Sequence, residues 1–146
     1  MTSAHPVASP TYTVLLVEDD DADVVLITEA LLERGGARDV RQVADGVAAL
    51  EVLHDPGLTR PDLIVLDLNM PRMNGLELLT HLKADPELAV IPVVVLSTSA
   101  APEDVTGAYR RHANAYVTKP VGLDDFIRAV RSIDVFFLDL ATKANP

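Results

Sequence analysis

Three short runs of apolar, mostly β-branched residues constrain the fold of this chain more than any other feature. They cover residues 14–17, 63–66 and 93–96. Polar residues do not alternate with apolar ones inside these runs, which indicates strands buried on both faces, as in a parallel sheet covered by helices. Two weaker runs, 40–44 and 116–117, complete the set. The sequence therefore predicts five strands of one sheet.

Helical patterns separate these predicted strands. We expect helices over residues 23–33, 47–54, 76–83, 102–111 and 123–133. The first ends at a Gly-Gly pair, the second and third end before Asp-Pro, and the fourth begins with a proline suited to a first helical turn. Five strand–helix units in series predict a single doubly wound α/β domain with right-handed crossovers.

The boundaries of that domain follow from the chain ends. We assign residues 1–10, rich in Pro, Ser and Thr, to a flexible leader, residues 11–134 to the domain, and residues 135–146 to an extension of the last helix. The first residues lack the charged and apolar regions of a secretory signal, and no apolar run reaches the roughly 18 residues of a membrane span. We expect a cytoplasmic protein that binds no membrane.

Composition excludes several kinds of function. The chain has no cysteine, so disulfides, thiolate metal sites and cysteine nucleophiles are ruled out. Its formal net charge is −10, from 22 acidic and 12 basic residues, and such a balance repels a phosphate backbone. We therefore expect no nucleic acid among its partners.

Polar residues follow four of the five predicted strands. They are Glu18 and Asp19 after the first strand, Asp67 after the third, Ser97 and Thr98 after the fourth, and Lys119 after the fifth. Ligands of open parallel sheets bind at the carboxyl ends of the strands, so these side chains should meet at one edge.

The chemistry of this set suggests phosphoryl transfer. Neighbouring carboxylates resist ionising together unless a cation joins them, and Mg²⁺ prefers oxygen ligands. Asp67 would then have the metal on one side and Lys119 on the other, and both could neutralise a phosphoryl group moving onto its carboxylate oxygen. A serine hydroxyl nearby could donate a hydrogen bond to the new phosphate.

Four segments carry a resemblance to a known family. They are LLVEDD (15–20), DLNMPRMNGLELL (67–79), VVVLSTSA (93–100) and AYVTKPV (115–121). In this order and spacing, over roughly residues 13–133, the chain resembles the CheY-like receiver domains of response regulators in two-component signalling. The resemblance implies a flavodoxin-like sheet with strand order 2-1-3-4-5 flanked by five helices. It also implies a single-domain phosphoacceptor of a phosphorelay, not an enzyme, fed by a sensor histidine kinase.

The same resemblance implies a role for individual residues. Asp67 is the phosphoacceptor, and Glu18 and Asp19 form the acidic pair. Mg²⁺ would be bound by Asp19, Asp67 and the backbone carbonyl of Asn69. Ser97 and Tyr116 take the two switch positions, Lys119 takes the position of the family's lysine, and the Lys119–Pro120 peptide bond is expected to be cis.

Three further features resemble the response regulators that partner bacterial and cyanobacterial phytochromes. These are an EDxxAD start (18–23), the segment HANAYVTKPV (112–121) and the tail SIDVFFLDL (132–140). They imply a phytochrome-type sensor kinase as partner. We also expect a homodimer through the fourth helix, fifth strand and fifth helix, extended by the tail.

Several residues admit a plainer interpretation. Tyr116 is either a switch residue or a half-buried packing tyrosine. Asp20, Asp21 and Asp23 are expected to cap the first helix and complement its dipole, with Asp21 the best cap, although Asp20 could also bind metal. The apolar tail around Phe136 either extends the core or forms the dimer surface.

Three other functions fit the sequence less well. A phosphatase of the haloacid-dehalogenase type also uses an aspartate at a strand end, but it needs a second acid two residues later, where this chain has Asn69, and no cap insertion is visible. A receiver that docks without being phosphorylated would not need the full set of acids and lysine. A nucleotide-binding role is disfavoured because neither GxGxxG nor GxxxxGK occurs.

Overall fold

A five-stranded parallel sheet forms the centre of the molecule. The computed structural model describes residues 11–33 and 38–142, so the leader predicted for residues 1–10 lies outside the described residues. The strands are β1 (Tyr12–Val17), β2 (Arg38–Val43), β3 (Leu63–Leu66), β4 (Val93–Ser97) and β5 (Ala115–Thr118). Their order in the sheet is β2-β1-β3-β4-β5, which confirms the predicted topology.

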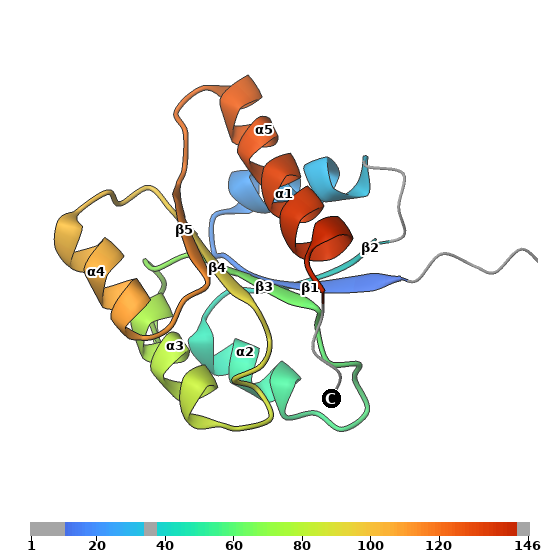
Figure 1. Cartoon of the computed structure of the whole chain (residues 1–146), viewed down its shortest axis with the longest axis vertical. Helices are drawn as coiled ribbons and strands as arrows, with labels where there is room; N and C mark the ends of the chain where they lie inside the picture. Colours follow the sequence, from blue (N-terminus) through green and yellow to red (C-terminus); the bar gives the residue numbers. More distant parts are fainter. Residues whose placement is uncertain (1–10, 34–37, 143–146) are drawn as a thin grey trace, which may run out of the picture.

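Five helices cover the two faces of this sheet. They are α1 (Asp21–Leu32), α2 (Gly46–Leu53), α3 (Gly75–Ala84), α4 (Pro102–Arg110) and α5 (Leu123–Asp134). Figure 1 shows α1 and α5 on one side of the sheet and α2, α3 and α4 on the other. Each helix and strand lies within two residues of its predicted bounds.

The core has two halves, one on each face of the sheet. Alternate strand residues such as Leu15 and Ile64 pack with α2, α3 and α4, while their neighbours Leu16 and Val65 pack with α1 and α5. All residues of β3 and β4 are buried, as the absence of polar alternation predicts. Burial on both faces therefore fixes the central strands, and with them the loops at their carboxyl ends.

The cap of the first helix lies one residue earlier than predicted. Asp20 is extended, and its carboxylate accepts a hydrogen bond from the backbone N–H of Asp23, so Asp20 is the N-cap. The prediction of Asp21 as the cap was wrong, because Asp21 is already the first helical residue.

The chain continues past α5 into a π-helical segment, η1 (Val135–Leu140). Leu138 is fully buried and belongs to the core on the α1–α5 side, whereas Phe136 is 57% exposed. The tail therefore extends the core and also presents an aromatic side chain to solvent.

An ion-pair network ties this tail to the edge strand β2. Arg38 Nε donates to Asp134 Oδ1 at 2.7 Å, and another guanidinium nitrogen donates to Asp139 Oδ1 at 2.9 Å. The guanidinium also lies over the ring of Tyr12, 5.0 Å from its centroid.

Among the described residues, none of the helices is long and apolar enough to cross a bilayer.

Candidate metal and phosphoacceptor site

Three carboxylates converge at the carboxyl edge of the sheet. Glu18 and Asp19 follow β1 and Asp67 follows β3, and oxygen atoms of the three side chains lie within 4.8 Å of one another. Oxygens on opposite sides of a bound Mg²⁺ are separated by roughly 4 Å, twice its bond length. The donor set therefore fits a hard divalent cation, and the structure brings these three predicted residues together.

A cavity of about 440 Å³ opens beside these carboxylates. Asp19 and Asn69 both line it, together with residues of the loop that joins β3 to α3. Asn69 is thus brought next to the acidic cluster by the same loop that carries Asp67. Coordination of a metal by its backbone carbonyl stays a prediction.

Lys119 adjoins the same carboxylates. Its Nζ atom is 2.6 Å from Glu18 Oε1, 2.7 Å from Asp23 Oδ2 and 3.7 Å from Asp67 Oδ2. Burial by itself would lower the pKa of Lys119, but the hydrogen bonds to Asp23 and Glu18 and the charge of Asp67 outweigh it and raise that pKa. Lys119 is therefore a fixed cation at neutral pH.

Glu18 has the opposite electrostatic situation. Burial raises the pKa of its carboxyl to about 7, although the hydrogen bond from Lys119 opposes this shift. The negative charge of Asp67 contributes to the rise in this pKa. A divalent ion placed among these carboxylates would favour the ionised form of Glu18, so metal binding and deprotonation are coupled here.

Asp23 belongs to this site, which the sequence did not predict. Asp23 lies in the first turn of α1, as its expected role toward the helix dipole requires, and its carboxylate also accepts a hydrogen bond from Lys119. Only the backbone N–H of Asp23 takes part in the cap. The one feature of the sequence that pointed to Asp23 was its place in the EDxxAD start. That motif does not indicate which residue its carboxylate contacts.

The loop after β4 connects the two predicted switch residues. Ser97 is fully buried at the end of β4, and its hydroxyl accepts a hydrogen bond from the backbone N–H of Ser99. The Tyr116 hydroxyl donates to the backbone carbonyl of Ser99 at 2.7 Å, and the Ser99 hydroxyl donates to Asp104 on α4. Tyr116 is half-buried and hydrogen-bonded, so it joins β5 to the loop between β4 and α4.

A separate ion pair holds the β3–α3 loop. Arg72 donates to both carboxylate oxygens of Asp45, at 2.7 and 3.0 Å, and Asp45 also caps α2. Arg72 has a φ of 61°, a left-handed conformation that is unfavourable for a side chain with a Cβ. At the end of the loop, a Cβ on Gly75 would lie 2.5 Å from the carbonyl oxygen of Asp67. The backbone around Asp67 is thus closely packed.

The expectation of a cis bond between Lys119 and Pro120 was wrong. Neither of the described segments contains a cis peptide bond. The trans form is the lower-energy isomer of an X–Pro bond, by about 0.5–1 kcal/mol.

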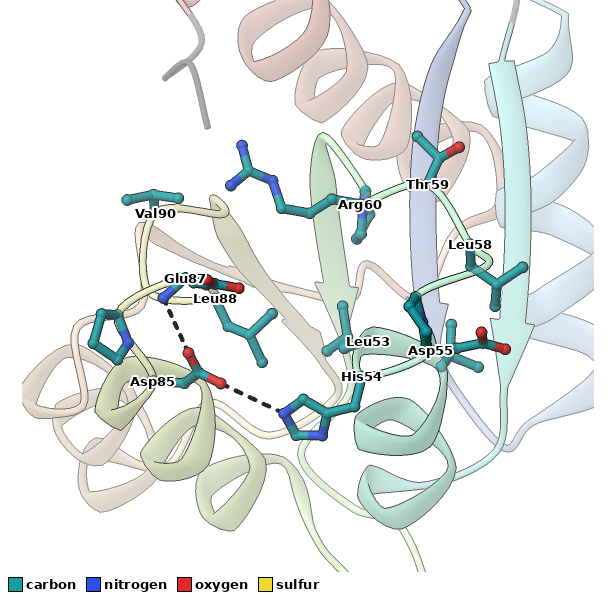
Figure 2. Close-up of a pocket in the computed structure, with 14 residues that line it drawn as sticks. Leu53, His54, Asp55, Leu58, Thr59, Arg60, Asp85, Glu87, Leu88 and Val90 are labelled. Atoms are coloured by element: carbon teal, nitrogen blue, oxygen red, sulfur yellow. Dashed lines mark hydrogen bonds and ion pairs between the residues drawn. The ribbon is translucent and has the colours of Figure 1, made fainter.

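A larger cavity, of about 650 Å³, lies away from the acidic cluster. Figure 2 shows it between the loop after α2 and the loop after α3, with His54 and Asp85 paired at 3.4 Å. These loops precede β3 and β4, so the cavity is at the amino ends of the strands, and none of the predicted site residues lines it. Size alone therefore does not identify the site.

Comparison with known proteins gives the family. Residues 14–131 match the response regulator receiver domain, and the chain belongs to this family. It is 40% identical over 139 residues to the response regulator Rcp1 of Synechocystis sp. (strain ATCC 27184 / PCC 6803 / Kazusa), covering 92% of this chain and 95% of that protein. It is 37% identical to the probable methanogenesis regulatory protein FilR2 of Methanothrix harundinacea (strain 6Ac), covering 95% and 92%.

Solved structures agree with the fold. The phosphorylated cyanobacterial phytochrome response regulator RcpA superposes with a TM-score of 0.90 at 41% identity, covering 93% of this chain and 100% of that one. The Mn²⁺-bound form of Rcp1 gives a TM-score of 0.87 at 39% identity, covering 92% and 99%. The predicted resemblance to receivers, and to phytochrome response regulators within them, is confirmed.

Proposed function

We propose that this receiver accepts a phosphoryl group from a sensor histidine kinase on the carboxylate of Asp67. One observation carries the proposal: a carboxylate oxygen of Asp67 lies within 4.8 Å of oxygens of two further carboxylates, and Asp67 is also 3.7 Å from the buried ammonium group of Lys119. Once a metal binds to the carboxylates, Asp67 has two cations close to it, the metal ion and Lys119. This is the arrangement that phosphoryl transfer to an oxygen nucleophile requires.

Magnesium is the metal we propose for the acidic cluster. Asp19, Asp67 and the backbone carbonyl of Asn69 would bind it directly, with Glu18 completing the acidic pair. When bound, the ion would neutralise charge on the phosphoryl oxygens and hold them beside Asp67. Support comes from the three-carboxylate donor set and from the similar protein Rcp1, whose solved structure contains Mn²⁺.

The transfer itself exchanges one bond for another. The P–N bond of the kinase phosphohistidine breaks, and its electron pair returns to the imidazole nitrogen as an Asp67 oxygen bonds to phosphorus. Lys119 neutralises charge on the phosphoryl oxygens. In the separate hydrolysis step that resets the switch, a water oxygen attacks phosphorus and the P–O bond to Asp67 breaks, which releases inorganic phosphate and restores the Asp67 carboxylate.

The switch runs from the phosphate through the loop after β4. Ser97 would donate its hydroxyl to the phosphoryl group and give up the hydrogen bond from Ser99. Because Tyr116 is bonded to the carbonyl of Ser99, movement of this loop changes the position of its ring. The populations of conformations on the α4-β5-α5 surface then shift.

A phytochrome-type sensor kinase is the partner we propose. The support is similarity: the chain is 41% identical to a cyanobacterial phytochrome response regulator over nearly all of both chains. Incubation of the chain with phosphorylated phytochrome-type and unrelated kinases should give faster transfer from the former. Equal rates from both kinds of kinase would contradict the pairing.

We also propose a homodimer through α4, β5 and α5, extended by η1. Tyr109 on α4 is 49% exposed and Phe136 on η1 is more so, and both are large apolar side chains whose burial would favour association. Sedimentation should give a dimer for the wild type and a monomer for Phe136→Asp. Leu58→Asp, another exposed apolar position far from these elements in sequence, is the control; a monomeric wild type would contradict the proposal.

Labelling tests the central claim. Acetyl phosphate with Mg²⁺ should add one phosphoryl group to the wild type, detected by intact mass. Asp67→Asn and removal of the metal should each abolish the gain, whereas Asp55→Asn, in an exposed turn, should not. Unlabelled wild type would favour a receiver that only docks, and multiple turnover of small phosphate esters would favour a phosphatase.

A further inference from the structure

Lys119 has one carboxylate partner that the proposed transfer does not use. Asp23 Oδ2 lies 2.7 Å from its Nζ atom, as close as Glu18 Oε1 at 2.6 Å. Asp67 Oδ2, at 3.7 Å, is beyond hydrogen-bonding distance. An ammonium group has three N–H donors, and two of them are directed to carboxylates other than the phosphoacceptor.

The two close partners differ in how easily they can release the lysine. The side chain of Glu18 is 2% exposed, that of Lys119 is 5% exposed, and that of Asp23 is 23% exposed. A released Glu18 carboxylate would remain buried, which is costly, but a released Asp23 carboxylate can regain water. Asp23 also lies in the first turn of α1, where the helix dipole favours a negative charge.

We propose that Asp23 is a positioning residue that competes with the phosphoryl group on Asp67 for Lys119. The inference rests on the proposed function. With Asp67 unmodified, Asp23 and Glu18 hold the ammonium. A phosphoryl group on Asp67 brings more negative charge to the site than the carboxylate alone, and Lys119 turns to it by leaving the more exposed partner. Asp23 thereby weakens the phosphorylated state relative to the resting state.

The side chain of Asp23 can be changed without removing the cap of α1. The cap depends on the carboxylate of Asp20 and the backbone N–H of residue 23, which every replacement except proline retains. Asp21, an exposed acid in the same helical turn, offers a matched control because it carries the same charge at a similar position in α1.

The probe is beryllofluoride, a tetrahedral phosphoryl mimic that binds to carboxylate oxygen, titrated at saturating Mg²⁺ and followed by ¹⁹F NMR. Asp23→Asn should bind it about fivefold more tightly than the wild type, the effect expected from one partly exposed ion pair. Asp23→Glu should restore the wild-type Kd, and Asp21→Asn should leave it unchanged. Asp23→Ser should follow Asp23→Asn.

Three results would overturn the inference. Equal or weaker binding by Asp23→Asn and Asp23→Ser, with circular dichroism like that of the wild type, would show no competition. An equal decrease of the beryllofluoride Kd in Asp21→Asn would show that the effect comes from the overall negative charge at the start of α1. Failure of Asp23→Glu to restore the Kd would show that the ion pair is not the cause. By contrast, a wild type that binds no beryllofluoride would refute the proposed function itself.

Discussion

Replacing Arg38 with alanine should destabilise the protein severely. The Arg38 side chain is 3% exposed and the Asp134 side chain is fully buried, with 2.7 Å between Nε and Oδ1. Removing the guanidinium deletes one partner of this buried ion pair. It also removes the hydrogen bond from the guanidinium to Asp139, which fastens η1 to β2.

The size of the effect follows from that burial. Breaking a buried ion pair by deleting one partner costs about 3–5 kcal/mol of unfolding free energy. Globular proteins unfold with an entropy of about 2.1 cal/mol/K per residue, so about 4 kcal/mol in a chain of 146 residues lowers Tm by roughly 13 °C. Buried Leu138 on η1 would lose support as well.

Urea unfolding followed by circular dichroism measures this difference, with Arg41→Ala as the matched control. Arg41 is on the same strand, 3.3 Å from Asp39, but the two side chains are 25% and 49% exposed, so its ion pair contributes less than about 1 kcal/mol. The double variant Arg38→Met/Asp134→Leu should recover most of the loss. A loss below about 1 kcal/mol for Arg38→Ala would refute the reasoning.

Two further predictions concern the acidic cluster. Gly75→Ala places a Cβ 2.5 Å from the carbonyl oxygen of Asp67 and should cost about 2 kcal/mol in urea unfolding, whereas Gly57→Ala in an exposed turn should cost under about 0.5 kcal/mol. Because the pKa of Glu18 is about 7 in the folded protein and 4.5 ordinarily, the metal-free protein holds a proton between those values and loses stability as pH rises through them. Mg²⁺ must displace that proton, so calorimetry should give about tenfold weaker binding at pH 6 than at pH 8. Glu18→Gln should remove the dependence, and an unchanged Kd in the wild type would contradict it.

The fold was predictable because the decisive information is local. In a strand, consecutive side chains point to opposite faces, so an apolar run of four residues is buried only where both faces are covered. This holds wherever the run lies in the chain. The placement of the site follows by geometry, since parallel strands bring their carboxyl ends to one edge. Glu18, Asp67 and Lys119 therefore meet without any information about rotamers.

Contacts made by side chains from distant helices were not predictable in this way. A shift of one residue along a helix turns a side chain by about 100°, so the difference between Asp20 and Asp21 as the cap also decides where Asp23 points. The pair of Arg38 and Asp134 joins residues 96 positions apart and has no sequence signal. The buried position of Leu138 depends on the π-helical segment, which no periodicity in the tail indicates.

The sum of charges explains why the contact between Asp23 and Lys119 matters at this site. Glu18, Asp19, Asp23 and Asp67 place four carboxylates around one ammonium, so with all groups ionised the cluster has a charge of −3, and of −1 with a divalent ion. A phosphoryl group adds further negative charge and also pairs with Lys119. One of the carboxylates must therefore lose its ion pair with this lysine. Solvent can screen the charge of Asp23 far better than that of buried Glu18. The acid that the sequence assigns only to a helix end is therefore the one best placed to adjust how strongly the switch holds its phosphate.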